Sequence, residues 1–267
     1  FLQSKYKMPV ADISVALDCA NGATASVAKD VFAGMCRQVT VINADPDGKN
    51  INDKCGATDT ADLQATVLEG KHDLGIAFDG DGDRIILVDG SGQVKNGDHI
   101  LYILGTQGGH KHIVATTMSN LGLETSLNSL NIDLLRTDVG DRYVLEEMIK
   151  NSYLLGGEQS GHIIIMPDQT TGDGMLAAIK ILEVIAKTGS SLSELSQDLQ
   201  IYPQSIVNVE LNDKSVLNDP IFTDFMKAKK NQIGDTGRIV IRPSGTEPLL
   251  RVMIESENAA TITPIVA

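Results

Sequence analysis

The sequence has 267 residues and a formal net charge of −13, which argues against a protein that binds nucleic acid. Its apolar fraction is ordinary for a globular protein, and no apolar run approaches the length of a membrane-spanning helix. The three cysteines, Cys19, Cys36 and Cys55, lack the spacing of a metal site, so we expect free thiols and a cytoplasmic protein. No signal peptide is visible, although the chain begins at Phe1 rather than at Met.

The first part of the chain alternates predicted strands and helices. The strands are predicted at residues 13–17, 39–42, 74–78 and 85–88, and the helices at residues 24–37 and 61–68. A long polar loop covers residues 43–58, and residues 89–92 form a hairpin turn. The β-α-β-α-β order predicts a mainly parallel sheet, which binds ligands beyond the carboxyl ends of its strands.

A second unit repeats this order, and a third unit differs from both. The second has predicted strands at 113–117, 132–136, 153–155 and 162–166, with helices at 97–104, 121–130, 140–150 and 174–187. After Pro203, strands at 206–211, 238–241 and 249–254 and a helix at 222–230 predict a small antiparallel sheet. The expected fold class is therefore α/β, with two consecutive α/β domains of mixed, mainly parallel sheets, followed by a small α+β domain. We place these domains at residues 1–107, 108–202 and 203–267.

The acidic loop Asp79-Gly80-Asp81-Gly82-Asp83-Arg84 is the chain's strongest functional signal. Apolar runs precede and follow it, so three carboxylates and a guanidinium sit at the end of a buried strand. Such carboxylates repel one another unless a cation lies between them, and hard oxygen ligands suit Mg²⁺. An EF-hand needs Gly at its sixth position and Glu at its twelfth, where this chain has Arg84 and Gly90, so we reject it. A solvated acidic turn is the simpler alternative, which the flanking strands and Arg84 disfavour.

The segment Arg242-Pro243-Ser244-Gly245-Thr246-Glu247-Pro248 joins two predicted strands, and Arg251 follows it. Two hydroxyls, backbone N–H groups beside a glycine and two arginines form a cradle suited to a phosphate dianion. The alternative is a polar hairpin with a Ser-Gly turn, but two prolines stiffen a loop that carries many hydrogen-bond donors.

A third loop, Gly156-Gly157-Glu158-Gln159-Ser160-Gly161-His162, connects two short strands. Glu158 and Ser160 are two residues apart in an extended loop and can point the same way, as a pair that binds sugar hydroxyls would. On its own this signal is weak, and a lone histidine such as His162 is more often structural. The stretch 172–177 matches a dinucleotide-binding fingerprint, but it follows a polar loop rather than a strand, so we assign it to helix capping.

With these three loops in this order, the chain resembles the α-D-phosphohexomutase superfamily over nearly its whole length. The resemblance also rests on the stretches 18–23, 117–122 and 139–143. Within the superfamily, the pattern is most similar to the bacterial phosphoglucosamine mutase branch, which serves amino-sugar nucleotide and cell-wall precursor synthesis. That branch implies interconversion of glucosamine 6-phosphate and glucosamine 1-phosphate through an enzyme phosphoserine and a bisphosphate intermediate.

The resemblance implies a role for each group of site residues. The expected Mg²⁺ ligands are Asp79, Asp81 and Asp83, and Arg84 is the expected catalytic residue that stabilises the transferring phosphoryl group. The expected substrate-binding residues are Glu158, Ser160, His162, Asp141, Arg142, Arg242, Ser244, Gly245, Thr246 and Arg251. Asp141, Arg142 and His162 are assigned only to the wall that faces the sugar.

One departure from the family's pattern bears on activity. The phosphorylated serine of the superfamily lies in a first domain, typically in Thr-Ala-Ser-His-Asn-Pro, and this sequence contains no Ser-His pair. Thr24-Ala25-Ser26 matches only the first three residues of that motif, and we expect it to lie in a helix. We therefore expect a C-terminal fragment that covers the second, third and fourth family domains, is inactive alone and needs the missing N-terminal domain as its partner.

Two alternatives stay open: a phosphomannomutase/phosphoglucomutase of the same superfamily, or a non-catalytic module that binds metal and sugar phosphate. The expected partners are a hexosamine phosphate and the missing domain, with no nucleic acid and no membrane. The sequence leaves the oligomeric state open, a homodimer included.

Overall fold

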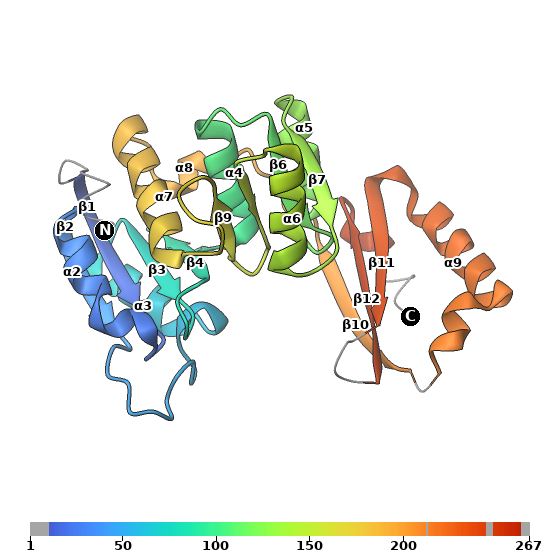
Figure 1. Cartoon of the computed structure of the whole chain (residues 1–267), viewed down its shortest axis with the longest axis horizontal. Coiled ribbons are helices and arrows are strands. Elements are labelled where there is room, and N and C mark those ends of the chain that lie inside the picture. Colours follow the sequence, from blue (N-terminus) through green and yellow to red (C-terminus); the bar gives the residue numbers. More distant parts are fainter. Residues whose placement is uncertain (1–10, 212, 244–247, 263–267) are drawn as a thin grey trace. The chain divides into compact units, whose positions relative to one another are not determined.

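The computed structural model describes residues 11–211, 213–243 and 248–262 (Figure 1). The chain folds into two compact units. The first unit comprises Phe1–Ser119 and Ser126–Leu199, and the second comprises Asn120–Thr125 and Gln200–Ala267. Within the described residues, no helix is both long enough and apolar enough to cross a membrane.

The first sheet of the first unit has five strands in the order β2-β1-β3-β4-β5. Their bounds are β1 Ala11–Asp18, β2 Cys36–Ile42, β3 Leu74–Phe78, β4 Ile85–Asp89 and β5 Val94–Lys95. β1 is parallel to β2 and β3, whereas β4 is antiparallel to β3 and β5. Every residue of β3 and β4 is buried, which explains why both strands read as continuous apolar runs. The helices of this part are α2 (Ala28–Ala33) and α3 (Ala61–Gly70), with short 3₁₀ turns η1 (Ala23–Ser26) and η2 (Gly56–Thr58).

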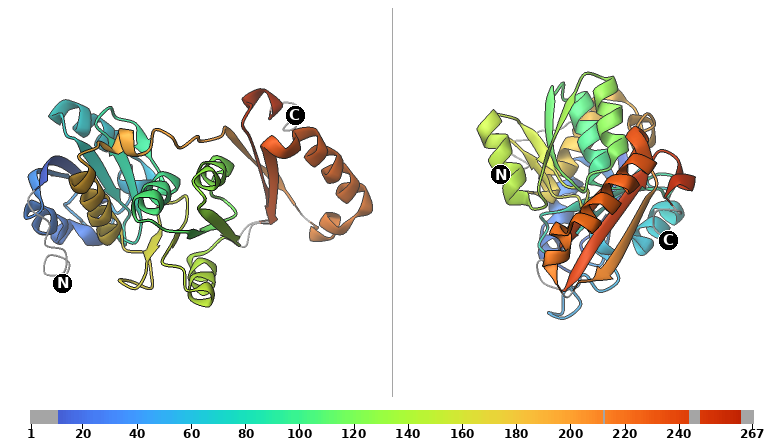
Figure 2. Two further views of the ribbon diagram at one scale, coloured as in Figure 1. Left: turned by 90° about the horizontal axis from the view of Figure 1, so that it is seen from above. Right: turned by 90° about the vertical axis from the view of Figure 1, so that its right-hand side faces the viewer.

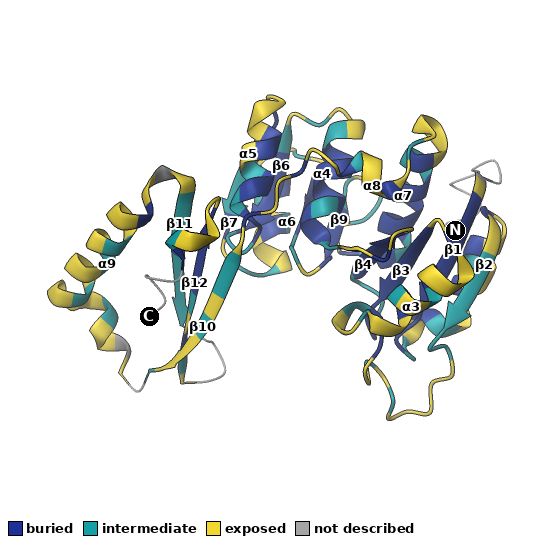
Figure 3. Ribbon diagram, turned by 180° about the vertical axis from the view of Figure 1, so that it is seen from behind, coloured by how far each residue is buried: buried dark blue, intermediate teal, exposed yellow. Residues whose placement is uncertain are grey.

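The second sheet of this unit has the order β7-β6-β8-β9. Its strands are β6 His112–Thr116, β7 Asp133–Thr137, β8 Leu155–Gly157 and β9 Ile163–Ile165. β6 is parallel to β7 and β8, and β9 is antiparallel to β8. The accompanying helices are α4 Gly97–Gln107, α5 Leu121–Ser129, α6 Asp141–Asn151, α7 Gly174–Thr188 and α8 Leu192–Leu195. Large parts of α4 and α7 are buried, as the dark blue ribbon shows (Figure 3).

The second unit contains an antiparallel sheet in the order β10-β12-β11, with α9 against it (Figure 2). Its elements are β10 Gln204–Glu210, η3 Lys214–Asn218, α9 Pro220–Ile233, η4 Gly234–Thr236, β11 Gly237–Pro243, β12 Leu249–Ser256 and η5 Ala259–Thr261. α9 begins where the Asp219 carboxylate accepts the Ile221 N–H and Pro220 occupies the first turn. A core of Ile233, Ile239, Ile254 and Ile262 joins the helix to the sheet.

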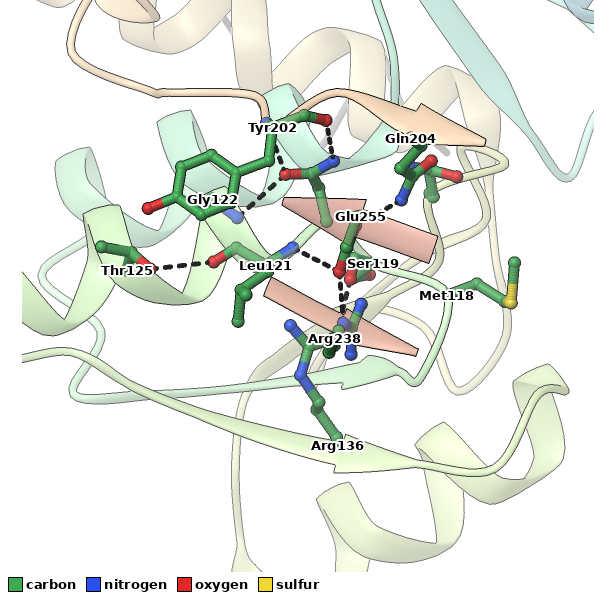
Figure 4. A network of polar contacts seen from close by, with 12 residues as sticks. Met118, Ser119, Leu121, Gly122, Thr125, Arg136, Tyr202, Gln204, Arg238 and Glu255 are labelled. Atoms are coloured by element: carbon green, nitrogen blue, oxygen red, sulfur yellow. Dashed lines mark hydrogen bonds and ion pairs between the residues drawn. The ribbon is translucent and has the colours of Figure 1, made fainter. Parts of the chain in front are cut away.

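Residues 120–125, the first turn of α5, belong to the second unit and are held there by polar contacts (Figure 4). The Asn120 side chain donates to Tyr202 O at 3.0 Å and accepts the Tyr202 N–H at 2.9 Å. The fully buried Glu255 carboxylate accepts the Leu121 N–H at 3.0 Å and the Gln204 amide at 2.6 Å, and it pairs with Arg238. A buried carboxylate needs such partners, so this network fixes the start of α5 to β12.

The expected fold class is confirmed: two α/β layers with mixed sheets precede a small antiparallel α+β part. One helix is corrected. Residues 24–37 do not form a single helix, because the backbone at Val27 leaves helical geometry between η1 and α2, and Arg37 already lies in β2. Gly156 and Gly157 lie in β8 rather than in a loop. The boundaries at residues 107/108 and 202/203 stay predictions.

Candidate functional site

The acidic loop lies at the carboxyl end of β3, directly before β4. Each of Asp79, Asp81 and Asp83 offers a carboxylate oxygen, and these oxygens lie within 4.8 Å of one another. Asp79 is fully buried, Asp83 is half-buried and Asp81 is exposed, so the group opens outward from a buried base. The Gly82 N–H donates to Asp79 O at 3.1 Å and closes the turn that aims the three side chains at one point. Three converging oxygens at this spacing fit a hard divalent cation such as Mg²⁺.

Arg84 lies on the same loop and contacts two of these aspartates. Its Nε and Nη2 each lie 2.7 Å from Asp79 Oδ2, and Nε lies 3.5 Å from Asp83 Oδ1. Burial alone lowers the pKa of the Arg84 guanidinium, but the three neighbouring aspartates raise it above its ordinary value. The guanidinium is therefore a fixed positive charge at the edge of the carboxylate group.

The loop that carries Glu158 and Ser160 is joined to the acidic loop by backbone contacts. The Ile85 N–H donates to Gly161 O at 3.1 Å, and Arg84 and His162 form an isolated antiparallel bridge. Gly161 has φ +95°, and a Cβ there would lie 1.9 Å from Ile85 O, so glycine is required at this position. Backbone contacts thus hold two loops that are far apart in the sequence against each other.

His162 is buried, with 6% of its surface exposed, and both ring nitrogens have neighbours. Nε2 accepts the Gly172 N–H at 2.8 Å, which leaves the proton on Nδ1, 3.2 Å from Asp83 Oδ2. The ring therefore donates to an aspartate of the acidic loop. The sequence did not predict this contact, because the two residues lie in different loops.

The glycine-rich stretch before α7 lies against the acidic loop. The Gly174 N–H donates to Gly82 O at 3.0 Å, and the Asp173 carboxylate accepts the Leu176 N–H at 2.9 Å as the helix cap. Capping, the role assigned from the sequence, therefore comes together with a close approach of this helix start to the candidate metal ligands.

Glu158 and Ser160 line one cavity of about 400 Å³. The Gly140 N–H donates to Glu158 Oε1 at 3.2 Å, and the Ser160 hydroxyl donates to Oε2 at 3.2 Å. Gln159 holds the loop in place by donating to Asp98 Oδ2 at 3.1 Å. The sequence assigned no role to the other residues that line the cavity, although three of them lie in stretches that carry the resemblance. These residues are Asn96, Thr116, Met118, Val139 and Gln159. A cavity with a carboxylate, a hydroxyl and amide groups can bind a polyhydroxylated ligand.

Asp141 and Arg142 open α6 and do not line this cavity. The Arg142 guanidinium contacts Glu146 on its own helix at 2.7 Å, and its side chain is 81% exposed. Asp141 Oδ1 accepts the Arg142 N–H at 2.8 Å, and Asp141 Oδ2 lies 4.0 Å from His162 Nε2. Their assignment to a wall that faces the sugar stays a prediction.

In the second unit, Ser244, Gly245 and Thr246 lie outside the described residues, but the arginines that flank them are described. Arg242 in β11 lies directly opposite Arg251 in β12. Directly opposite residues of an antiparallel pair lie on the same face, so both guanidinium groups belong to one face of this sheet. In addition, the Arg242 Nε is buried and has no hydrogen-bond acceptor among the described residues. Both features fit a site that receives an anion.

Comparison with known proteins places this geometry in a family. Models of the phosphoglucomutase/phosphomannomutase family match the chain in sequence: alpha/beta/alpha domain II over residues 2–92, alpha/beta/alpha domain III over 96–202, and the C-terminal domain over 206–267. The chain belongs to the phosphoglucomutase/phosphomannomutase family.

Curated members of this family are similar over most of the chain. The phosphoglucosamine mutase of Nitrosococcus oceani is 47% identical over 96% of this chain and 58% of its own length. That of Finegoldia magna is 43% identical over 97% of this chain and 60% of its own length. The chain thus spans somewhat more than half the length of these relatives.

Solved structures of the family share the fold. A phosphoglucomutase/phosphomannomutase family protein from Burkholderia thailandensis gives a TM-score of 0.81 at 20% identity and covers 99% of this chain and 61% of its own. N-acetylphosphoglucosamine mutase from Aspergillus fumigatus, in complex with GlcNAc-6P and magnesium, gives 0.78 at 19% identity and covers 96% of this chain and 60% of its own. At these identities the likeness shows the fold alone.

Proposed function

We propose that this chain supplies the metal-binding, sugar-binding and phosphate-binding parts of a phosphoglucosamine mutase, which interconverts glucosamine 6-phosphate and glucosamine 1-phosphate. The observation that carries the proposal is the joining of the acidic loop to the loop with Glu158 and Ser160 through Gly161 and His162. The similarity to proteins named phosphoglucosamine mutase supports the choice of sugar.

Asp79, Asp81 and Asp83 are proposed to hold Mg²⁺, because their oxygens converge at the end of β3. The bound cation would supply positive charge beside the phosphoryl group during transfer. Arg84 is the proposed catalytic residue, since it holds a guanidinium at the same point and remains positively charged at any working pH. Asp79 and Asp83 orient that guanidinium at 2.7 and 3.5 Å.

Glu158 and Ser160 are proposed to bind sugar hydroxyls, one as an acceptor and the other as a donor and acceptor. Their shared cavity of about 400 Å³ suits one hexose ring. Because both side chains can accept hydrogen bonds from hydroxyl groups, the pair can bind the hydroxyls of the ring in either of two orientations. A mutase that moves phosphate between two positions of a sugar must bind that sugar in both orientations.

Arg242, Ser244, Gly245, Thr246 and Arg251 are proposed to hold the phosphate that is not reacting. The pair of opposed arginines and the buried Nε of Arg242 support this role. A dianion at this point would accept a charge-assisted hydrogen bond from the buried Arg242 Nε. The remote phosphate would thereby supply binding energy that orients the reacting end of the substrate.

The phosphoserine that this mechanism needs has no candidate in the chain, so the proposal concerns the full-length protein. The test is an assay of that protein with glucosamine 6-phosphate, glucose 6-phosphate and mannose 6-phosphate, each with Mg²⁺ and its cognate hexose 1,6-bisphosphate. We expect kcat/KM to be highest for the amino sugar. A preference for glucose or mannose phosphate would instead identify a phosphoglucomutase or phosphomannomutase, as the description of the matching family allows.

A variant tests the metal assignment directly. Asp81→Asn should weaken binding of Mn²⁺, used as a spectroscopic substitute for Mg²⁺, by about tenfold or more. Substituting even a residue that only hydrogen-bonds to a metal ligand typically lowers metal affinity by about 10- to 100-fold. Asp53→Asn, which removes an exposed carboxylate from the neighbouring loop, should leave the affinity unchanged. Equal affinities of Asp81→Asn and the parent protein would refute the metal site.

A further inference from the structure

Asp18 is the last residue of β1, and no role assigned above uses it. Its side chain is fully buried, and in the sheet it is paired with Ala77, two residues before Asp79. Burial raises the pKa of its carboxyl group, and N–H bonds from Ala20 and Gly56 counteract that effect in part. Burying a carboxylate at such a depth is costly unless its oxygens accept hydrogen bonds. Besides the Asn43 side chain, two backbone N–H groups interact with this carboxylate, and they show which segments it holds.

The first partner belongs to the turn that leads from β1 to η1. Asp18 Oδ1 accepts the Ala20 N–H at 2.9 Å, and Ala20 and Asn21 both have positive φ, +52° and +47°. Such conformations in non-glycine residues persist only where their surroundings hold them. The same turn then contacts the acidic loop, because the Ala23 N–H donates to Gly80 O at 2.8 Å.

The second partner belongs to the long polar loop of residues 43–58. Asp18 Oδ2 accepts the Gly56 N–H at 2.9 Å. Earlier in this loop, the Asn52 N–H donates to Ala20 O at 2.9 Å, which ties the loop to the first turn. The Asn52 side chain packs on Gly80, since a Cβ placed on Gly80 would lie 2.6 Å from Asn52 Nδ2.

The two segments that Asp18 holds therefore both contact Gly80, the residue between Asp79 and Asp81. We propose that Asp18 is a positioning residue for the metal site: its carboxylate holds the two segments that fix the Gly80 peptide, and thereby the direction of the flanking carboxylates. This inference rests on the proposed assignment of Asp79, Asp81 and Asp83 as metal ligands. In this role Asp18 would act through these segments rather than as a metal ligand.

Asp18→Asn is the primary test, because the amide has the same shape but only one oxygen. Either the Ala20 or the Gly56 N–H then faces an NH₂ group. We expect the affinity for Mn²⁺, measured by electron paramagnetic resonance of the free ion, to fall by about tenfold, the lower end of the cost of losing a direct hydrogen-bond partner of a metal ligand, because Asp18 acts through the backbone. In metal-free protein, we expect the Ala23 amide to exchange its hydrogen faster.

The matched control is Asp89, a second buried carboxylate in the same sheet. It is 1% exposed and is the last residue of β4, at the end of that strand away from the acidic loop, where it pairs with Leu74. Its Oδ1 accepts the N–H groups of Ser91 and Gln93, each at 3.0 Å. Asp89→Asn would keep that oxygen, so Asp89→Ala is the variant that leaves donors unpaired. It should lower the stability of the protein and leave both the Mn²⁺ affinity and Ala23 exchange unchanged.

A milder variant covers the case in which Asp18→Asn does not fold. Asn52→Gly removes the side chain that packs on Gly80 while glycine tolerates the φ of +57° at this position. It should weaken Mn²⁺ binding in the same direction by a smaller factor.

The outcomes separate the inference from the proposed function. If Asp18→Asn and Asn52→Gly are destabilised like Asp89→Ala but bind Mn²⁺ as tightly as the parent protein, Asp18 serves stability alone and the inference is wrong. If Asp81→Asn also leaves Mn²⁺ affinity unchanged, the metal assignment itself fails. Exchange at Ala23 would still report whether Asp18 holds the turn against the acidic loop.

Discussion

At the scale of single residues, the contacts of His162 show how a candidate metal ligand is oriented. Its ring lies between the Gly172 N–H and the Asp83 carboxylate, so that one nitrogen can only accept and the other donates to Asp83. A carboxylate held in this way loses little freedom when it binds a cation. A histidine that reads as structural from the sequence alone is thus part of the support for the acidic loop.

Two substitutions of His162 should separate this support from simple packing. His162→Phe removes both ring nitrogens, and we expect it to weaken Mn²⁺ binding by about 10- to 100-fold. His162→Asn can place an amide N–H where Nδ1–H was, so it should recover part of that loss, although both variants deprive the Gly172 N–H of its acceptor. Equal affinities of the two variants in a Mn²⁺ titration would show that the bond to Asp83 has no effect.

At the scale of elements, the sequence predicted strands better than it predicted contacts. The buried runs of β3 and β4 identify themselves because no position in either strand faces water. The predicted helix of residues 24–37 is wrong because the backbone leaves helical geometry at Val27, between η1 and α2, and because β2 already begins at Cys36, and helical periodicity reveals neither. The bridge between Arg84 and His162 was beyond prediction, because it depends on how two loops distant in the chain are brought together.

The start of α4 gives a prediction about pH. Burial, and then Lys95, lower the pKa of His99 from 6.5 to about 4, while Asp89 acts in the opposite sense. The folded protein therefore binds fewer protons at His99 than the unfolded chain between pH 6.5 and about 4, and stability falls as the pH is lowered through that window. His99→Gln removes this titration, so its urea midpoint should fall less on acidification than that of the parent protein. Parallel pH profiles of the two proteins would contradict the shift.

The β11–β12 hairpin gives a prediction about kinetics. In the full-length protein, Arg242→Ala should raise KM and lower kcat, because the remote phosphate would lose a partner that also orients the reacting end. Charge-assisted hydrogen bonds contribute roughly 1.5–3 kcal/mol, which corresponds to a loss in kcat/KM of about 10- to 100-fold. Lys230→Ala removes an exposed cation from α9 of the same unit and should change neither parameter. If Arg242→Ala has wild-type kinetics, the proposal that residues 242–248 bind phosphate is wrong.

At the scale of the whole molecule, the two units carry different parts of the proposed chemistry. The first holds the acidic loop and the cavity lined by Glu158 and Ser160, and the second holds the opposed arginines. Of the serines considered as nucleophiles, Ser160 donates to Glu158, and Ser26 is exposed at the end of the 3₁₀ turn η1. We therefore predict that neither residue is the covalent phosphate carrier that the proposed mechanism requires.

It follows that a polypeptide of these 267 residues should not interconvert the two glucosamine phosphates, even with Mg²⁺ and glucose 1,6-bisphosphate present. Water could replace the nucleophile, but it would release phosphate instead of isomerising the sugar. A sensitive coupled assay on this polypeptide, beside the full-length protein as the positive control, checks the expectation. Turnover that disappears on substitution of Ser26, Ser160 or Ser244 would identify a nucleophile in this chain.

The contact between Gly22 and the acidic loop has a consequence for how such a protein tolerates mutation. Gly22 has φ −116°, which any residue can adopt, yet a Cβ there would lie 2.2 Å from Gly80 O. The position is therefore closed to every other amino acid by lack of space alone. In a survey of all single substitutions scored by activity, we expect Gly22 to be as intolerant as the aspartates it lies beside. The site would then be vulnerable at a residue that has no side chain and takes no part in the reaction.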